Sequence, residues 1–160
     1  MTNLTPHFAL EEFQKGDPIP SACIGIFTDL AEKILEPVRS EFQKALVITS
    51  GYRSPEQNRE AHGIPNSEHV ATTFFCACDF YVEGLGSRFV FDWIRQNPAI
   101  PFHQLILESD ASGGSIIHIS YNKTIPGVRS VLVGATHNAA PYQKVDYVAY
   151  EASESQDEKT

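Results

Sequence analysis

Apolar residues in the first quarter of the chain recur with the period of a helix. Within residues 21–42 they are spaced three or four apart, at Ile26, Phe27, Leu30, Ile34, Leu35 and Val38. This spacing predicts an amphipathic helix capped by Ser21. Pro37 is expected to bend the helix or to end its first part, because proline lacks the backbone N–H that a helix interior needs.

Shorter apolar runs bounded by turn residues predict strands. They are expected at 46–49, 77–82, 104–108 and 115–121, with further strands at 130–133 and around 145–148. Residues 109–114 are expected to join two of these strands as a hairpin connection. Helical segments are expected at 10–13, from Ser54-Pro55 onward and at 87–96. Because helices come first and antiparallel strands follow, the predicted fold class is α+β.

Composition narrows the classes of partner. The 160 residues allow one domain with one core, and the net charge of −8 argues against nucleic acid as the main partner. No apolar stretch approaches the roughly 18 residues of a membrane span. The N-terminus lacks a basic start followed by an apolar run, so we expect a chain without a secretory signal that folds in the cytosol. Residues 151–160 are acidic and polar, which predicts a solvated, disordered tail.

Three cysteines, Cys23, Cys76 and Cys78, give an odd number and no disulfide framework. Free cysteine is usually buried, so we expect all three to be reduced and packed as small apolar residues. The alternative is that Cys76 and Cys78 are soft metal ligands, although a second cysteine pair that would complete a four-thiolate site is missing.

Two of the six histidines stand in a context that suggests chemistry. His69 lies in a polar loop upstream of a strand that carries Asp79, and His118 lies in the middle of an isoleucine-rich strand. Alternation places Asp79 on the strand face opposite Cys76, Cys78 and Phe80. Burying a carboxylate or an imidazole among apolar residues is costly unless the group is paired or bound to a metal. Two imidazoles, one carboxylate and a water form a common catalytic zinc site, and a metal-free Asp79–His118 hydrogen bond is the alternative.

Several ordered motifs resemble one family. They are Ser50-Gly51-Tyr52-Arg53-Ser54-Pro55-Glu56-Gln57-Asn58-Arg59, Pro65-Asn66-Ser67-Glu68-His69, Ala77-Cys78-Asp79-Phe80, Gln104-Leu105-Ile106-Leu107-Glu108 and Ile117-His118-Ile119-Ser120-Tyr121, preceded by Leu4-Thr5-Pro6-His7-Phe8-Ala9-Leu10-Glu11-Glu12-Phe13 and Leu35-Glu36-Pro37-Val38-Arg39. Together they resemble the zinc D-Ala-D-Ala carboxypeptidases and phage endolysin peptidases over roughly residues 4–133. The resemblance implies a Hedgehog/DD-peptidase-like fold, with helices packed on a small, mainly antiparallel sheet. It implies a peptidase domain at 1–134, followed by a peripheral extension at 135–150 and the acidic tail.

The resemblance also implies roles for single residues. His69, Asp79 and His118 are expected to bind Zn²⁺, which would lower the pKa of a water molecule that attacks the amide. Arg53 is expected to face the substrate and to stabilise negative charge on the scissile carbonyl, or else to tie its loop to the following helix. Ser67 is expected to contact the substrate.

A general base is still needed, and some relatives carry a carboxylate three residues before the last histidine, where this chain has Ser115. We predict Glu108 as the catalytic base, with Asp110 in reserve. Either residue could also be an ordinary carboxylate at a hairpin end.

The chain departs from the family pattern between the first two proposed ligands. The usual motif, Ser-x-His-x-x-Gly-x-Ala-x-Asp, has about three extra residues here and no glycine. A loop absorbs an insertion at little entropic cost, but the missing glycine matters if its position requires a positive φ. Phe74 and Phe75 are expected to pack into the core; lining a pocket or widening a contact with a partner are the alternatives.

These observations predict a monomeric zinc peptidase that cuts a stem or cross-link peptide of bacterial peptidoglycan, either as an endopeptidase or as a D,D-carboxypeptidase. Such an enzyme would reach the cell wall after release from the cytoplasm or as part of a virion. A catalytically inactive binding or virion-structural domain of the same fold is one alternative. A zinc peptidase for another substrate, such as free D-Ala-D-Ala, is the other.

Overall fold

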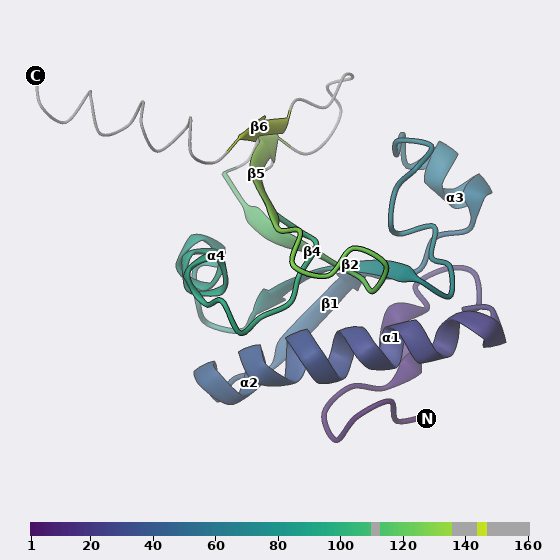
Figure 1. The fold of residues 1–160 in the computed structure, drawn as a ribbon, viewed down its shortest axis with the longest axis horizontal. Helices are drawn as coiled ribbons and strands as arrows, with labels where there is room; N and C mark the ends of the chain where they lie inside the picture. The colour runs from purple at the N-terminus through teal and green to yellow at the C-terminus, as the bar shows by residue number, and fades with distance from the viewer. Residues whose placement is uncertain (110–112, 136–143, 147–160) are drawn as a thin grey trace, which may run out of the picture.

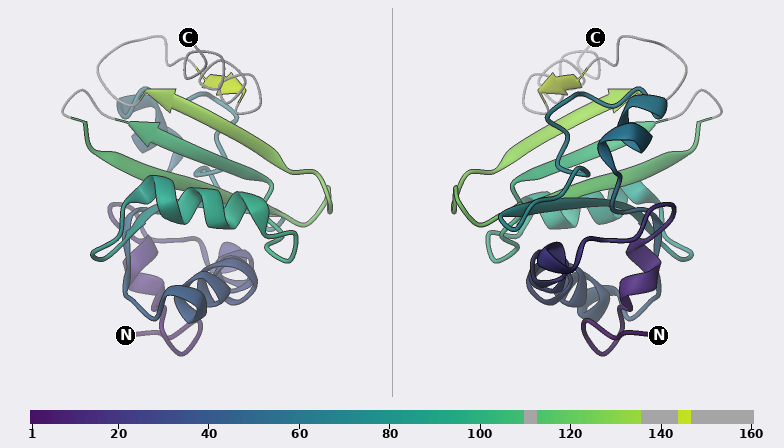
Figure 2. Two further views of the ribbon diagram at one scale, coloured as in Figure 1. Left: turned by 90° about the vertical axis from the view of Figure 1, so that its left-hand side faces the viewer. Right: turned by 90° about the vertical axis from the view of Figure 1, so that its right-hand side faces the viewer.

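A twisted sheet with helices packed against one face forms the centre of the molecule (Figures 1 and 2). The computed structural model describes residues 1–109, 113–135 and 144–146. The reserve base Asp110, the tail at 151–160 and most of the extension at 135–150 therefore lie outside the described residues. Within the described ranges, no helix combines the length and the apolar character needed to cross a membrane.

The six strands have the order β1-β2-β4-β3-β5-β6 in the sheet. Their bounds are β1 (Leu46–Ser50), β2 (Phe75–Val82), β3 (Gln104–Ser109), β4 (Ser115–Asn122), β5 (Ser130–Ala135) and β6 (Lys144–Asp146). All neighbouring strands are antiparallel except β3 and β5, which are parallel. The predicted α+β class with a mainly antiparallel sheet is confirmed.

The predicted helix over 21–42 is helical throughout but changes its winding. A 3₁₀ turn (Ser21–Cys23) leads into α1 (Ile24–Leu30), a π-helical turn (Ala31–Leu35) and α2 (Glu36–Phe42). Pro37 is the second residue of α2, which directly follows the wide π turn, so the change of winding falls next to the residue that lacks a helical N–H donor. Pro37 thus coincides with a change of helix type rather than an end.

The remaining helical segments lie close to their predicted positions. They are a 3₁₀ turn at Leu10–Phe13, α3 (Pro55–Glu60) and α4 (Ser87–Gln96). Ser54 caps α3, because its hydroxyl accepts a hydrogen bond from the backbone N–H of Gln57 at 3.2 Å. At the C-terminal end of α4, Arg129 donates hydrogen bonds to the carbonyl oxygens of Ile94 and Asn97, at 3.2 and 2.9 Å.

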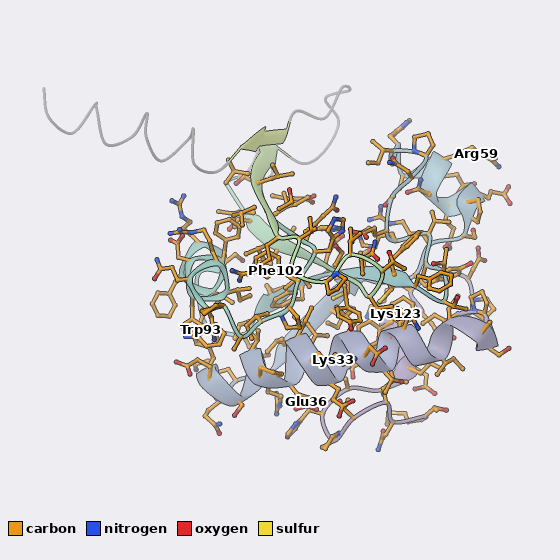
Figure 3. All side chains as sticks on the ribbon, in the orientation of Figure 1. Lys33, Glu36, Arg59, Trp93, Phe102 and Lys123 are labelled. Carbon is orange, nitrogen blue, oxygen red and sulfur yellow. The ribbon has the colours of Figure 1, made fainter. Side chains whose placement is uncertain are left out.

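The two faces of the sheet have different characters. Alternate strand residues, among them Phe80, Ile117 and Leu105, are fully buried in one core with residues of α1, α2 and α4. Phe102, which precedes β3, joins the same core (Figure 3). Asp79 and His118 point to the opposite face, since side chains alternate along a strand. Helices α1, α2 and α4 thus cover one face, and Asp79 and His118 lie on the other.

The cysteines follow this division. All three are free and buried, as predicted, and Cys76 donates a weak hydrogen bond from Sγ to the carbonyl oxygen of Ile26 in α1, at 3.4 Å. Cys76 and Cys78 lie on the face of β2 opposite Asp79. Burial raises the pKa of both thiols well above the usual value, which favours the neutral form of a packed apolar side chain.

The expectation for Phe74 was wrong. Phe74, the residue before β2, is 52% exposed, and its carbonyl oxygen accepts a hydrogen bond from the backbone N–H of Lys123 at 3.0 Å. Phe75 is partly buried. The missing glycine is also explained: among described non-glycine residues, positive φ occurs only at Gln43 and His62, so the segment between His69 and Asp79 needs no glycine.

Candidate metal centre

Three side chains from different parts of the chain converge on the polar face of the sheet. His69 comes from the segment between α3 and β2, Asp79 from β2 and His118 from β4, and all three are buried. Asp79 and His118 are directly paired across the two strands. The structure therefore brings together the three residues that the sequence singled out as metal ligands.

One atom of each residue faces the other two. His69 Nε2 lies 3.2 Å from Asp79 Oδ1 and 3.2 Å from His118 Nδ1, and His118 Nδ1 lies 2.9 Å from Asp79 Oδ1. Donor atoms bound tetrahedrally to zinc at about 2.0–2.1 Å lie about 3.3 Å apart. The spacing of the three atoms is close to that of ligands on one small cation.

The protonation of His69 supports this interpretation. Its Nδ1 lies 2.7 Å from the carbonyl oxygen of Gly51, which can only accept a hydrogen bond, so Nδ1 carries the proton. In the neutral ring, Nε2 then presents a lone pair to the carboxylate oxygen of Asp79. Two facing acceptors repel each other unless a cation lies between them. The residues present thus fit a metal ion, and the Gly51 carbonyl fixes the tautomer that binding requires.

Charge and hydrogen bonding hold Asp79 in its ionised form. Burial raises the pKa of this carboxyl, but when the imidazoles and not a cation carry the positive charge, their attraction and hydrogen bonds outweigh burial and hold the pKa well below its usual range. His118 Nε2 is buried without a hydrogen-bond partner among the described residues. The orientation of that ring thus depends on its Nδ1 contacts with His69 and Asp79.

Arg53 lies beside the cluster. Its Nη2 is 3.4 Å from Asp79 Oδ2, the carboxylate oxygen not facing the imidazoles, and donates to Ser50 Oγ at 3.1 Å. The Arg53 backbone N–H also donates to the carbonyl oxygen of His69, at 3.0 Å. The guanidinium, with about a quarter of the side chain exposed, therefore brings positive charge next to the three donor atoms.

Ser67 and Glu108 lie near the three donor residues, Ser67 in the loop of His69 and Glu108 on strand β3. The hydroxyl of Ser67 accepts the backbone N–H of His69 at 3.3 Å, so it shapes the loop. Ile106 pairs with His118, and Glu108, two residues further along β3, points to the same face. Such diagonal neighbours are roughly 7–8 Å apart, within reach of long side chains. Substrate contact by Ser67 and base catalysis by Glu108 stay predictions.

A second polar cluster lies next to His69, and no sequence motif indicated it. Glu68 is 8% exposed, and both of its carboxylate oxygens lie 2.9 Å from His103 Nδ1. Asn122 Nδ2 donates to Glu68 Oε1 at 3.2 Å. These residues are 35 and 54 positions from Glu68 in the sequence, so no local pattern indicated the contact.

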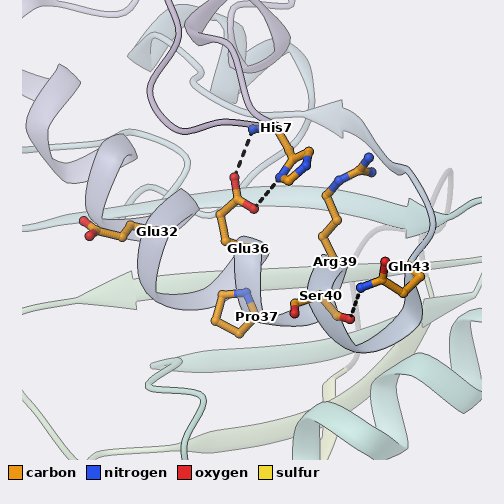
Figure 4. A pocket seen from close by; sticks show the side chains of 7 residues that line it. All are labelled: His7, Glu32, Glu36, Pro37, Arg39, Ser40 and Gln43. Carbon is orange, nitrogen blue, oxygen red and sulfur yellow. Dashed lines mark hydrogen bonds and ion pairs between the residues drawn. The ribbon is translucent and has the colours of Figure 1, made fainter.

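A hollow of about 510 Å³ lies elsewhere, between the N-terminal segment and α2 (Figure 4). Glu36, one of the lining residues, accepts hydrogen bonds from the backbone N–H of His7 at 3.0 Å and from His7 Nδ1 at 2.7 Å. The hollow belongs to the helical layer, whereas the donor atoms lie on the opposite face of the sheet. The hollow is therefore separate from the candidate metal centre, and its volume alone does not indicate a functional site.

Two histidines and an aspartate gathered at one face of a sheet, with an arginine beside them, are the donor set typical of single-metal hydrolase sites. The comparison with protein families gives the particular family. The model described as Peptidase M15 matches residues 6–112, and the chain belongs to this family of peptidases. The matched region includes His69 and Asp79 and ends before His118. No curated protein and no solved structure matches the chain.

Proposed function

We propose that the protein is a zinc-dependent peptidase that hydrolyses peptide bonds of bacterial peptidoglycan. The observation that carries the proposal is the cluster of His69 Nε2, Asp79 Oδ1 and His118 Nδ1, mutually 2.9–3.2 Å apart and buried. Membership of the M15 peptidases supports the reaction class. The substrate class rests on the resemblance of the motifs to cell-wall carboxypeptidases and endolysins. The monomeric state and the route to the wall stay predictions.

The chain supplies what amide hydrolysis needs around the ion. Zinc held by the three donors would supply Lewis-acid polarisation of a carbonyl and a water of lowered pKa. Glu108 would accept a proton from the attacking water and return it to the leaving amine. Arg53 would stabilise the negative charge that develops on the carbonyl oxygen, an effect that is large where water is excluded.

A second candidate function is a domain of the same fold that binds but does not cut. Ser115 occupies the position where some relatives carry a carboxylate, and the interval between His69 and Asp79 is longer than in the family pattern. Both observations favour loss of catalysis without loss of the metal. Zinc binding without turnover is the result that this alternative predicts.

Mass spectrometry of muropeptides separates the two functions. Purified peptidoglycan is incubated with the protein as prepared, with a chelator, and with chelator followed by excess zinc. New fragments that vanish with chelator and return with zinc are expected, and their masses identify the bond. A folded, zinc-loaded protein that releases no fragment from several wall chemotypes would overturn the proposal in favour of the binding domain.

A pair of isosteric variants shows whether the three-donor cluster carries the activity. Asp79→Asn should lose zinc and release no fragments, because the amide brings no negative charge to the cation. Asp29→Asn changes the same residue type in α1, where the carboxylate pairs with Lys33 at 2.7 Å, and should keep both properties. Zinc-dependent turnover by Asp79→Asn at the wild-type rate would place the active centre elsewhere.

A further inference from the structure

The residue before His69 is itself buried and charged. Glu68 is almost fully excluded from solvent, which costs several kcal/mol for a carboxylate without partners. Here both oxygens lie 2.9 Å from His103 Nδ1, and Asn122 Nδ2 binds Oε1 at 3.2 Å. His103 directly precedes β3, and Asn122 is the last residue of β4. The carboxylate of Glu68 therefore joins its loop to the ends of two central strands.

Two consecutive residues of this loop reach well-separated points of one strand. The imidazole of His69 contacts His118 in the middle of β4, while the carboxylate of Glu68 contacts Asn122 four residues further along. At 3.3 Å per residue, these two points are about 13 Å apart. Anchors at such a distance fix both the position and the direction of the backbone between them.

His69 depends on such anchors more than the other two donors do. Asp79 and His118 sit on paired strands, whose ladder holds them in place. His69 sits in a segment between the end of α3 at Glu60 and the start of β2 at Phe75, without regular secondary structure. A metal site requires its ligands to be held within about 0.5 Å of the productive geometry. The Glu68 contacts add a link to the ends of strands β3 and β4, beyond the hydrogen bonds that His69 makes with Gly51, Arg53 and Ser67.

We propose that Glu68, held by His103 and Asn122, is a positioning residue that sets the metal affinity of the centre through the loop carrying His69. The inference rests on the proposed function, since it presumes that the three donors hold zinc. Supporting residues around a metal site commonly change affinity by ten- to a hundredfold when removed. Glu68 would act through the backbone of its neighbour and not by touching the ion.

The test measures the zinc Kd by chelator competition and the visible spectrum of the Co²⁺-substituted protein. Glu68→Ala should weaken zinc binding roughly ten- to a hundredfold and alter the Co²⁺ bands, which report the ligand geometry. Glu68→Gln keeps the shape and an acceptor for Asn122, so it should retain more affinity than Glu68→Ala. Asn122→Ala removes one of the two partners and should weaken binding less than Glu68→Ala.

The matched control is the pair of Glu36 with His7, which also joins a loop to an element through a glutamate and a histidine, at 2.7 Å. It lies in the helical layer, on the other side of the sheet (Figures 3 and 4). Glu36→Ala should leave the zinc Kd and the Co²⁺ spectrum unchanged, whatever it does to the melting temperature of the metal-free protein.

Three results would overturn the inference. They are a wild-type Kd and spectrum in Glu68→Ala, an equal loss of affinity in Glu36→Ala, and a Glu68→Gln variant as impaired as Glu68→Ala. If Glu68→Ala fails to fold, Glu68→Gln and Asn122→Ala decide the question by the same measurements. Wild-type protein that binds no zinc would instead refute the proposed function, so the two failures are distinguishable.

Discussion

At the scale of single residues, two oxygen atoms of one carboxylate have different tasks. Asp79 Oδ1 faces the imidazoles of His69 and His118, and Oδ2 faces Arg53 at 3.4 Å. A carboxylate shared in this way lies between the metal-binding atoms and a fixed positive charge. Arg53 therefore has a partner in the absence of substrate, which keeps the guanidinium near the position where negative charge would develop during hydrolysis.

The proposed base gives the first residue-scale prediction. Glu108→Gln removes the proton acceptor but keeps the size of the side chain, so turnover should fall by roughly 10²- to 10⁴-fold. Zinc content should not change, because Glu108 is outside the cluster of His69, Asp79 and His118. Initial rates on a defined muropeptide, together with metal analysis, provide the measurement.

Glu83→Gln is the control for this prediction, since Glu83 is an exposed carboxylate just beyond the end of β2. It should behave as wild type. A Glu108→Gln enzyme with turnover within a factor of two of wild type would remove Glu108 from the mechanism.

The sequence predicted single residues well where a motif carried them. His69, Asp79 and His118 were identified from their context and from the family resemblance, and the structure brings them together. Glu68 was missed because its partners, His103 and Asn122, are distant in sequence and become neighbours only through strand pairing. Phe74 was assigned to the core, but apolar character alone does not show whether a side chain outside a regular element is buried.

At the scale of elements, helix α4 buries one of its faces in the core and exposes the other. Val90, Phe91 and Ile94 are fully buried in the core, whereas Phe89 on the same helix is 62% exposed. Phe89 contacts the ring of Phe42 with a centroid distance of 5.8 Å. Two phenylalanines two positions apart therefore contribute very differently to the stability of the fold.

This difference gives a prediction for α4. Phe91→Ala should lower the free energy of unfolding by about 3–5 kcal/mol, because it removes a buried ring and leaves a cavity. Phe89→Ala should cost about 1 kcal/mol or less, since it removes one exposed aromatic contact. Urea unfolding followed by circular dichroism measures both values. Equal losses in the two variants would contradict the assignment of the buried face.

Most elements were predictable because their signals are local. The Ser54 cap followed by proline marked α3, and the alternation in β2 separated Asp79 from the buried cysteines, as the structure has them. The π-helical turn before Pro37 and the parallel pairing of β5 with β3 were not predicted. Helix type and strand direction depend on contacts between segments that are distant in sequence. A local pattern carries little of that information.

At the scale of the whole molecule, net charge bears on the proposed substrate. The chain carries −8, and many bacterial walls are themselves anionic, so repulsion should slow the approach of enzyme to wall. Screening weakens this repulsion, because the Debye length falls from about 30 Å at 0.01 M salt to about 8 Å at 0.15 M. Long-range charge should therefore affect polymeric and soluble substrates differently.

Salt dependence tests this argument. Release of fragments from whole walls should rise severalfold between about 0.01 and 0.15 M NaCl as repulsion is screened. Hydrolysis of a small neutral muropeptide should change little over the same range, as should digestion of walls stripped of anionic polymers. Faster digestion of intact walls at the lower salt concentration would show that a local basic surface, and not net charge, governs the approach.

The direct pairing of Asp79 with His118 across β2 and β4 has a consequence for the link between metal binding and folding. These two donors are 39 residues apart in sequence and meet only when β2 and β4 pair, while His69 reaches them from an irregular loop. An unfolded chain would therefore bind a metal ion poorly, because its three donors are not assembled. If the centre binds zinc as proposed, free zinc would shift the folding equilibrium toward the native state, so the stability of the protein would rise with the zinc concentration.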